Sequence, residues 1–431
     1  MQTPANADDH VFLFLQGPHG PFFQLLGRML NTAGATVWRV GFNSGDSAFW
    51  RDRKSYLPYR GSATDWPDAI DTILETRGIT DLVVYGDSRA RHRAAIAAAN
   101  RRGLRVHVFE EGYLRPYWIT YERNGSNGNS RLMTLSIDQM RAALATTDAE
   151  ITLPPGHWGD MREHMFYGAL YHWFVMFRNR RYPHFEPHRG ITAHQEFRLQ
   201  LHRFLRMPMH ALARHRATLR IRRGGFPYHL ALLQLEHDSS FQDHSPFSTM
   251  TDFLALVVSG FARGAPQHHH LVLKAHPLED GRVPLRRHIR RLARDHGIPD
   301  RVHFVRGGKL ARLLDDATSV VTVNSTAGQQ ALWRGLPLKT FGRSVYDKPE
   351  LVSDQPLTAL FASPRRPDAA AYRKYRRFLL ATSQVPGGYY SVRGRRQLLR
   401  RIVDIMLAAQ DPYDALTEKT AAAGQQVRLV P

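Results

Sequence analysis

The sequence predicts an α/β protein with two Rossmann-like halves. Near both ends of the chain, short apolar runs typical of buried strands alternate with amphipathic or Ala-rich helical segments. Between them, residues 154–226 lose this alternation and become rich in Arg, His and aromatic side chains. A length of 431 residues suits two or three domains. We therefore expect two parallel sheets flanked by helices, a cleft between the halves, and a basic, mainly helical insertion.

The first half, residues 1–153, opens with two strand, helix and strand units. The run VFLFL at 11–15 predicts a strand, the loop QGPHGP follows it, and FFQLLGRMLNTAG at 22–34 has the helical pattern before the strand TVWRV at 36–40. The second unit, at 81–112, consists of DLVVYGD, the Ala-rich RARHRAAIAAANRRG and LRVHVFEEG. Ligands of parallel sheets bind beyond the carboxyl ends of strands, where QGPHGP and the closing EEG both fall.

The second half, residues 227–416, resumes the alternation. Its predicted strands lie in YHLALLQLE, HLVLKAHP, VHFVRGG, SVVTVNSTAG and LPLKTFG. The helical segments between them are TDFLALVVSGFARG, a basic helix, KLARLLDDA and QQALWRGL. Residues 417–431 are expected to form a flexible tail.

The composition excludes several kinds of site. The chain has no Cys, so it has no disulfide, no thiolate metal ligand and no Cys nucleophile. The start MQTPANADDH lacks the features of a secretory signal, and the run FYGALYHWFVMF is too short to span a bilayer. We expect a cytoplasmic protein, either free or resting on a membrane surface.

A formal net charge of +21 favours an anionic partner: nucleic acid, acidic phospholipid or a nucleotide-linked substrate. Residues 154–226 form either an ordinary helical subdomain or a membrane-surface patch, in which each Lys or Arg near anionic lipid contributes about 1 kcal/mol. The predicted patch combines basic with aromatic side chains: Arg178, Arg180, Arg181, Arg203 and Arg206 with Trp173, Phe174, Phe177 and Phe204.

Glu110 and Glu111 place two adjacent carboxylates where a buried strand should end. One interpretation is a solvated turn in which Gly112 supplies a positive φ. In the other, one carboxylate accepts a proton from an acceptor hydroxyl or binds a sugar, while its neighbour is structural. Gly17 and Gly20 of QGPHGP lie beside the expected cleft and allow a close approach, although the loop matches neither a dinucleotide fingerprint nor a P-loop.

Two strand ends of the second half carry polar groups suited to an anion. KAHPLED supplies a cation, an imidazole and a Pro that fixes the exit of the chain; these are Lys274, His276 and Pro277. NSTAG opens a helix, so the hydroxyls and free backbone N–H groups there form either a phosphate site or a plain helix cap; its polar residues are Asn324, Ser325 and Thr326.

Glu236 and Asp238 have a spacing that suits either of two chemistries. The two carboxylates could hold a divalent cation. Alternatively, Asp238 is a single reactive carboxylate in a polar loop beside two Ser residues. No convincing metal-ligand spacing occurs among the 23 His, so no metal site is predicted there.

Taken in order, the motifs resemble those of the KpsS-type capsule polysaccharide proteins. The blocks, scattered over residues 11–347, are FLQGPHGPFF, FNSGDSAFW, EEGYLRPYWIT, LQLEHDSSFQDHSPF, KAHPLE and NSTAGQQALWRGLPLKTFGRSVYD. Proteins of this type are β-Kdo transferases of lipid-anchored capsule assembly with a GT-B-like fold. The resemblance implies CMP-Kdo as donor, a phosphatidylglycerol-type lipid or a Kdo-primed lipid as acceptor, and no cofactor. It also implies a place on the inner face of the cytoplasmic membrane, with a second capsule Kdo transferase as a partner.

The resemblance further implies roles for individual residues. Lys274 and His276 would face the CMP phosphate, and Ser325 and Thr326 would donate hydrogen bonds to it. Asp238 matches the position of an essential Asp in related β-Kdo transferases. Ala275 stands where the pattern has a basic or imidazole residue, which changes the expected phosphate geometry.

The expected chemistry is retaining transfer without an obligatory metal. CMP-Kdo and the β product share an anomeric configuration, so a carboxylate that attacks and is then displaced gives retention. Asp238 is the first candidate for this nucleophile, and Glu111 is the base or the alternative nucleophile. Two other classes remain as alternatives: a non-catalytic capsule export or scaffold subunit, and a basic nucleic-acid-binding protein, for which no recognised module appears in the sequence.

Overall fold

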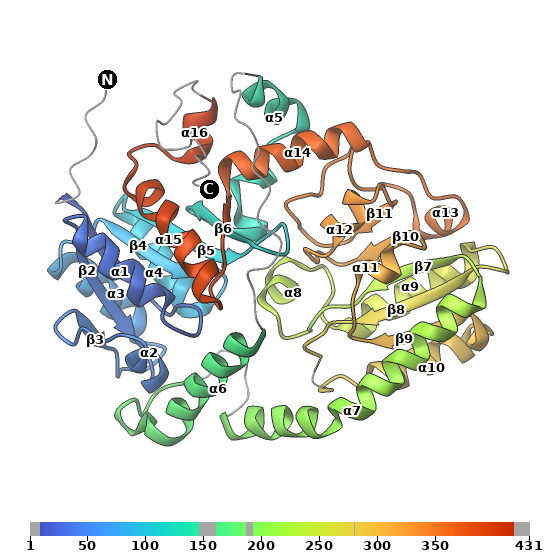
Figure 1. The fold of residues 1–431 in the computed structure, drawn as a ribbon, viewed down its shortest axis with the longest axis horizontal. Helices are drawn as coiled ribbons and strands as arrows, with labels where there is room; N and C mark the ends of the chain where they lie inside the picture. Colours follow the sequence, from blue (N-terminus) through green and yellow to red (C-terminus); the bar gives the residue numbers. More distant parts are fainter. Residues whose placement is uncertain (1–8, 146–160, 187–192, 280, 418–431) are drawn as a thin grey trace. The chain divides into compact units, whose positions relative to one another are not determined.

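The computed structural model describes residues 9–145, 161–186, 193–279 and 281–417 (Figure 1). These residues fall into two compact units. Unit 1 takes the described residues of Met1–Arg131, Asp138–His194 and Arg376–Pro431, and unit 2 takes those of Leu132–Ile137 and Gln195–Tyr375. Each unit holds one sheet, which confirms the predicted α/β class with two Rossmann-like parts.

Unit 1 contains a seven-stranded sheet of order β12-β6-β5-β4-β1-β2-β3. The strands are β1 (Val11–Phe14), β2 (Thr36–Gly41), β3 (Tyr56–Pro58), β4 (Asp81–Tyr85), β5 (Arg105–Glu111), β6 (Trp118–Arg123) and β12 (Gln384–Pro386). The predicted strands β1, β2, β4 and β5 pair in parallel, as expected, and β3, which was not predicted, joins them in parallel beside β2. The sheet then continues through two antiparallel pairings that were not predicted, of β5 with β6 and of β6 with β12.

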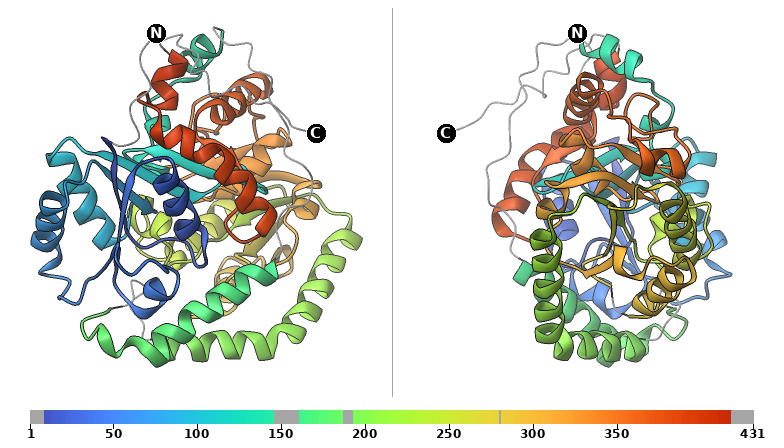
Figure 2. Two further views of the ribbon diagram at one scale, coloured as in Figure 1. Left: turned by 60° about the vertical axis from the view of Figure 1, so that its left-hand side comes forward. Right: turned by 90° about the vertical axis from the view of Figure 1, so that its right-hand side faces the viewer.

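Helices cover both faces of this sheet (Figure 2). The helices of unit 1 are α1 (Phe22–Thr32), α2 (Ser44–Ala48), α3 (Trp66–Thr76), α4 (Ala90–Arg101), α5 (Ile137–Leu144), α6 (Met161–Arg178), α15 (Val392–Leu407) and α16 (Pro412–Thr417). Successive side chains of a strand point to opposite faces. Phe12 and Phe14 accordingly pack with side chains of α1 and α15, whereas Leu13 and Leu15 pack with those of α3 and α4.

Unit 2 contains a parallel five-stranded sheet of order β11-β10-β7-β8-β9. Its strands are β7 (Tyr228–Leu232), β8 (His270–Ala275), β9 (Val302–Arg306), β10 (Ala317–Thr322) and β11 (Leu338–Thr340). Its helices are α7 (Ala193–Gly224), α8 (Ser239–His244), α9 (Met250–Gly264), α10 (Leu285–Asp295), α11 (Ala311–Leu314), α12 (Gly328–Trp333) and α13 (Leu357–Ala362), and the boundary between the units falls within α14 (Ala369–Thr382). Short 3₁₀ helices occur at Asn127–Asn129, Arg131–Met133, Asn179–Arg181 and Pro299–Arg301.

The start of α9 shows how local sequence sets an element of unit 2. The Thr249 side chain accepts the backbone N–H of Asp252, and the Asp252 carboxylate accepts the N–H of Thr249, which is a capping box. The apolar face that follows is fully buried: Phe253, Leu254, Val257, Val258 and Phe261 pack against the sheet in one core with residues of β7, β8 and α13.

Two predicted boundaries differ from the structure. Residues 227–416 were expected to form one C-terminal domain, but β12 pairs with β6, and α15 buries Leu398 and Ile402 in the core of unit 1. The predicted insertion, 154–226, is likewise divided: α6 packs on α2 in unit 1, whereas most of α7 belongs to unit 2. The predicted tail, 417–431, lies outside the described residues except for Thr417 at the end of α16.

Candidate functional site

The carboxyl ends of the parallel strands of unit 1 collect polar side chains. The chain proceeds from β1 to β2 and β3 on one side of the sheet and from β4 to β5 on the other, so the order reverses between β1 and β4. Ligands of doubly wound sheets bind outside the strand ends at such a reversal. Gln16 and Arg89 occupy this position, and Arg89 Nη1 donates a hydrogen bond to Gln16 Oε1 at 2.8 Å.

Glu110 and Glu111 are the last two residues of β5. They continue the strand because β6 pairs with them: Glu110 lies opposite Thr120 and Glu111 opposite Ile119. Both carboxylate side chains are half-buried. Glu110 Oε1 accepts the backbone N–H of Glu111 at 2.9 Å, whereas Glu111 Oε1 accepts the hydroxyl of Tyr85 at 3.1 Å. Glu111 is therefore held by a side chain from the end of the neighbouring strand β4.

Aromatic side chains surround Glu111 and shield part of its carboxylate from solvent. Tyr85 and Tyr390 are half-buried, and burial together with the negative charge of Glu111 raises the pKa of both phenols. His164 of α6 stacks edge-on against Tyr390 with ring centroids 4.2 Å apart. Burial lowers the pKa of His164, although the charge of Glu111 acts in the opposite direction. A neutral imidazole and phenol hydroxyls beside a carboxylate suit recognition of a hydroxyl-rich acceptor.

The glycines of the predicted site allow close approaches. A Cβ on Gly112 would lie 2.2 Å from the carbonyl oxygen of Trp118, so contact with the backbone of β6 requires a Gly at this position. Gly112 does not have the positive φ that the turn interpretation expected. Gly20 does, with φ of 112°, and a Cβ there would lie 3.1 Å from the ring of Tyr167 on α6. A Cβ on Gly17 would overlap Phe23 at 2.4 Å.

A buried network next to this position was not predicted. Asp46 is 1% exposed, and burial raises the pKa of its carboxyl despite Arg39, whose Nη2 lies 3.6 Å from Oδ1. Tyr171 of α6 donates to Asp46 Oδ1 at 3.3 Å and accepts hydrogen bonds from Asn43 Nδ2 at 2.7 Å and Gln16 Nε2 at 2.5 Å. The network therefore attaches α6 to the strand ends of unit 1. Its sequence signal is the block FNSGDSAFW, which contains both Asn43 and Asp46.

In unit 2 the structure places a buried cation at the predicted anion site. Lys274 is the penultimate residue of β8 and is 5% exposed. Burial, and secondarily the charge of Arg214, lowers the pKa of Lys274 to about 8. Its Nζ donates to the carbonyl of Ala275 at 3.4 Å, and no carboxylate of the described residues lies within ion-pair distance. A buried ammonium without a carboxylate is unfavourable, so an anionic ligand would stabilise it.

His276 and Pro277 follow Lys274 directly. The Nδ1 of His276 accepts the backbone N–H of Leu278 at 3.1 Å, which fixes the orientation of the ring. Pro277 is exposed, and its Cα lies beside the Gly307 turn after β9. The KAHP turn and the end of β9 therefore border the same region of unit 2.

Asn324 forms hydrogen bonds with three other residues of unit 2. Its backbone N–H donates to Gln234 Oε1 at 2.9 Å, and its Oδ1 accepts Gln234 Nε2 at 2.7 Å. Its Nδ2 donates to the carbonyls of Ser240 at 2.7 Å and His244 at 3.2 Å. Since the side chain is engaged in this way, we give Asn324 a positioning role. Half-buried Ser325 and Thr326 remain the residues of this motif that can contact a phosphate.

Asp238 and Glu236 have different surroundings. Asp238 is exposed and precedes α8, the helix that Asn324 holds at Ser240. Glu236 Oε2 accepts the backbone N–H of Met250 at 2.8 Å, so this carboxylate caps α9. In the described part of the chain no group of three or more His, Asp or Glu side chains is arranged to hold a metal ion.

The structure thus divides the predicted residues between two strand-end clusters. Unit 1 contains Glu110, Glu111, Gly112, Gly17 and Gly20, and unit 2 contains Asp238, Lys274, His276, Pro277, Asn324, Ser325 and Thr326. Tertiary structure adds Arg89, His164, Tyr171 and Tyr390 to the first cluster and Arg214 to the second. These added residues come from helices and loops that carry no recognisable motif.

Comparison with known proteins identifies the family. The family described as capsule polysaccharide biosynthesis protein matches residues 80–390, which is most of the chain. The chain belongs to this family. The match includes both carboxylates of β5, the KAHP turn and the NST motif, so it agrees with the resemblance found from the motifs.

This member of the capsule polysaccharide biosynthesis family has curated relatives of nearly its own length. It is 31% identical over 380 residues to the capsule polysaccharide export protein KpsS of Escherichia coli, with 88% of this chain and 96% of the relative covered. It is 30% identical over 384 residues to the capsule polysaccharide modification protein LipB of Neisseria meningitidis, with 88% and 91% covered. A solved β-Kdo 2,7 transferase, KpsC of Thermosulfurimonas dismutans, aligns over 92% of this chain and 100% of that chain with 12% identity and a TM-score of 0.42.

Proposed function

We propose that this chain is a retaining glycosyltransferase that transfers Kdo from CMP-Kdo to a phosphatidylglycerol-type lipid, or to a Kdo-primed lipid, for the lipid anchor of a capsule polysaccharide. The observation that carries the proposal is the buried Lys274 near the end of β8, close in the chain to His276, for which the described residues supply no carboxylate partner. Fixed cations of this kind stabilise the charge of a departing phosphate. The motif resemblance supplies the identity of the donor and acceptor, and the family supplies the setting of capsule synthesis.

The proposed roles follow from position and residue type. In unit 2, Lys274, His276, Ser325 and Thr326 bind the CMP phosphate. The Asp238 carboxylate attacks the anomeric carbon, the bond to the phosphate oxygen breaks, and CMP leaves with the electron pair. The acceptor hydroxyl then displaces Asp238 and gives its proton to a general base. Two displacements restore the starting configuration.

Replacing His276 with Ala should weaken CMP binding at least about tenfold, because a hydrogen bond to a charged group is removed. Calorimetric titration with CMP measures this change directly. His296→Ala, which removes an exposed His at the end of α10, is the matched control and should leave the affinity unchanged. Unchanged CMP affinity of His276→Ala would remove this residue from the site.

The function as a whole is tested by transfer itself. The protein should convert CMP-Kdo and phosphatidylglycerol vesicles into a Kdo-lipid of the expected mass, even with excess chelator, because we assign the leaving-group charge to Lys274 and backbone N–H groups. CMP binding without transfer would favour the export or scaffold alternative. Salt-sensitive binding to duplex DNA without CMP binding would favour the nucleic-acid alternative.

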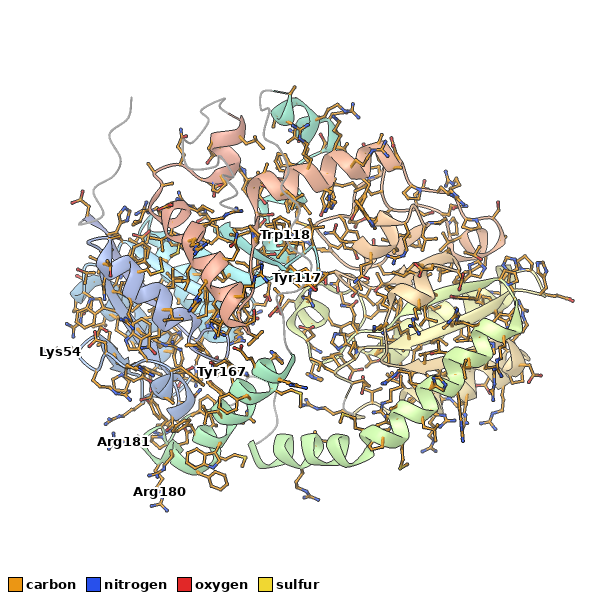
Figure 3. All side chains as sticks on the ribbon, viewed as in Figure 1. Lys54, Tyr117, Trp118, Tyr167, Arg180 and Arg181 are labelled. Carbon is orange, nitrogen blue, oxygen red and sulfur yellow. The ribbon has the colours of Figure 1, made fainter. Side chains whose placement is uncertain are left out.

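The basic and aromatic surface of unit 1 supports a peripheral membrane site. On α6 and the turn after it, exposed Phe166, Trp173 and Phe177 precede exposed Arg178, Arg180 and Arg181, of which the last two are labelled in Figure 3. The predicted patch residues Arg203, Phe204 and Arg206 have side chains outside the described part of the chain. None of the helices in the described ranges combines the length and apolar character needed to cross a bilayer. The surface therefore suits adsorption to anionic lipid.

Reversing two charges of this surface should release the protein from vesicles. We expect the variant Arg180→Glu/Arg181→Glu to bind phosphatidylglycerol-rich vesicles at least about tenfold more weakly, because each basic residue contributes about 1 kcal/mol. Vesicle sedimentation at low and high salt measures the effect. Arg286→Glu/Arg287→Glu on α10 makes the same change of net charge in unit 2 and is the control. Equal losses in both variants would show a dependence on net charge alone.

A further inference from the structure

Arg214 of α7 lies across the double-glycine turn that follows β9. Gly307 and Gly308 have φ of 68° and 84°, a region that favours Gly. A Cβ on Gly308 would lie 2.7 Å from Arg214 Cδ, and one on Gly307 would lie 3.9 Å from both Arg214 Nη1 and Pro277 Cα. The two glycines therefore leave room for the Arg214 side chain and bring its guanidinium toward the KAHP turn.

This arrangement places a second cation near Lys274. The charge of Arg214 contributes to the lowered pKa of Lys274, after burial. No carboxylate of the described residues lies within ion-pair distance of either side chain. Arg306 at the end of β9 adds a third cation and contacts His210 of α7 at 3.2 Å, while the nearby Glu279 carboxylate accepts the N–H of Gly281.

The positive charge of Lys274 and Arg214 together exceeds the single negative charge of one phosphodiester. A CMP ester of a neutral sugar carries a single negative charge at the phosphate, whereas a CMP-linked 2-keto acid sugar carries a second one on its carboxylate. Neighbouring cations repel one another unless anions compensate them. Two fixed cations beside the phosphate position therefore suit a donor with two anionic groups.

We propose that Arg214 binds the carboxylate of the CMP-linked sugar, while Lys274 faces the phosphodiester. This inference rests on the proposed function and makes Arg214 a determinant of donor specificity. The planar guanidinium matches a carboxylate through two parallel hydrogen bonds, which an ammonium cannot provide. Neutral-sugar esters of CMP gain nothing from this contact.

The test compares two nucleotides on each variant. Freshly synthesised CMP-Kdo carries both charges, and the methyl ester of CMP carries the phosphodiester charge alone. Arg214→Met should weaken CMP-Kdo binding at least about tenfold and methyl-ester binding less than about threefold. Lys274→Met should weaken both ligands. Arg216→Met, which removes an exposed Arg two residues further along α7, is the control and should change neither affinity.

Two further comparisons keep the inference open to contradiction. Arg214→Gln, which retains a hydrogen-bond donor, replaces Arg214→Met if the latter melts at a lower temperature than wild type. Equal loss of both ligands in the Arg214 variants, or no loss, would overturn the inference while leaving CMP binding and the proposed function intact. Failure of the wild-type protein to bind either nucleotide would instead overturn the proposed function, and this inference with it.

Discussion

Replacing Asp238 with Asn should lower Kdo transfer by roughly three orders of magnitude or more while donor affinity changes less than about threefold. The two side chains have nearly the same shape, so the change removes the attacking charge and little else. Asp238 is exposed at the start of α8, where a sugar could reach it, and Asn324 holds that helix through the carbonyl of Ser240. A carboxylate in this position needs no rearrangement of the core to attack.

The measurement is single-turnover transfer in chelator, together with calorimetric titration of the donor. Asp243→Asn on the same short helix makes the same chemical change at another exposed position and should retain activity. A Kdo adduct mapped to Asp238 by mass spectrometry would support the covalent route. If chelation instead abolishes wild-type transfer and divalent ions restore it, Asp238 acts as a metal ligand.

Near-normal turnover of Asp238→Asn would transfer the nucleophile role to Glu111. Its carboxylate is held by Tyr85 at 3.1 Å and lies near His164, so Glu111→Gln would then abolish the adduct and the transfer together. Glu110→Gln is the control for Glu111→Gln, since Glu110 Oε1 accepts the backbone N–H of Glu111 in the same strand.

Replacing Lys274 with Met should weaken CMP binding by about tenfold to a hundredfold without lowering the melting temperature. An ion pair with a phosphate is lost, but an apolar side chain of similar length suits a position that is 5% exposed. In the wild-type protein the ammonium is buried with no carboxylate partner among the described residues, and burial lowers its pKa. A folded variant with reduced affinity would separate ligand binding from stability.

The same residue predicts the pH dependence of binding. The pKa of Lys274 is about 8 without ligand, and a bound phosphate raises it. Binding therefore takes up a proton above that pH, and CMP affinity should be level near pH 7 and fall by up to about tenfold per pH unit above pH 8. Calorimetry from pH 7 to 9.5 measures the slope. A slope that persists in Lys274→Met would assign the titration to another group.

The sequence by itself determined the class of the fold and most of its parallel strands. Apolar runs such as VFLFL at 11–15 and HLVLK at 270–274 are fully or largely buried strands, because both faces of a parallel sheet are covered by helices. The amphipathic pattern of α9 and its capping box are local features, so both can be predicted from the sequence without knowing which elements α9 packs against. The strand-end motifs were predictable for the same reason, since a motif adjoins its own strand.

Only the tertiary structure decided which distant segments complete each cluster. The pairing of β12 with β6 joins residues about 265 positions apart. A strand as short as Gln384–Pro386 has too few residues for a hydrophobic pattern that would predict its partner strand. In the sequence, nothing distinguishes Tyr171 and Arg214 from their neighbours in a basic helical stretch. In the structure, Tyr171 forms a hydrogen bond with Asp46, and Arg214 packs over Gly308. The sequence predicts that Asn324 binds a ligand, but in the structure its side chain forms hydrogen bonds with Gln234 and with the carbonyl of Ser240. These roles depend on long-range packing, in which spatial neighbours are set by the burial of whole faces and leave no local pattern in the chain.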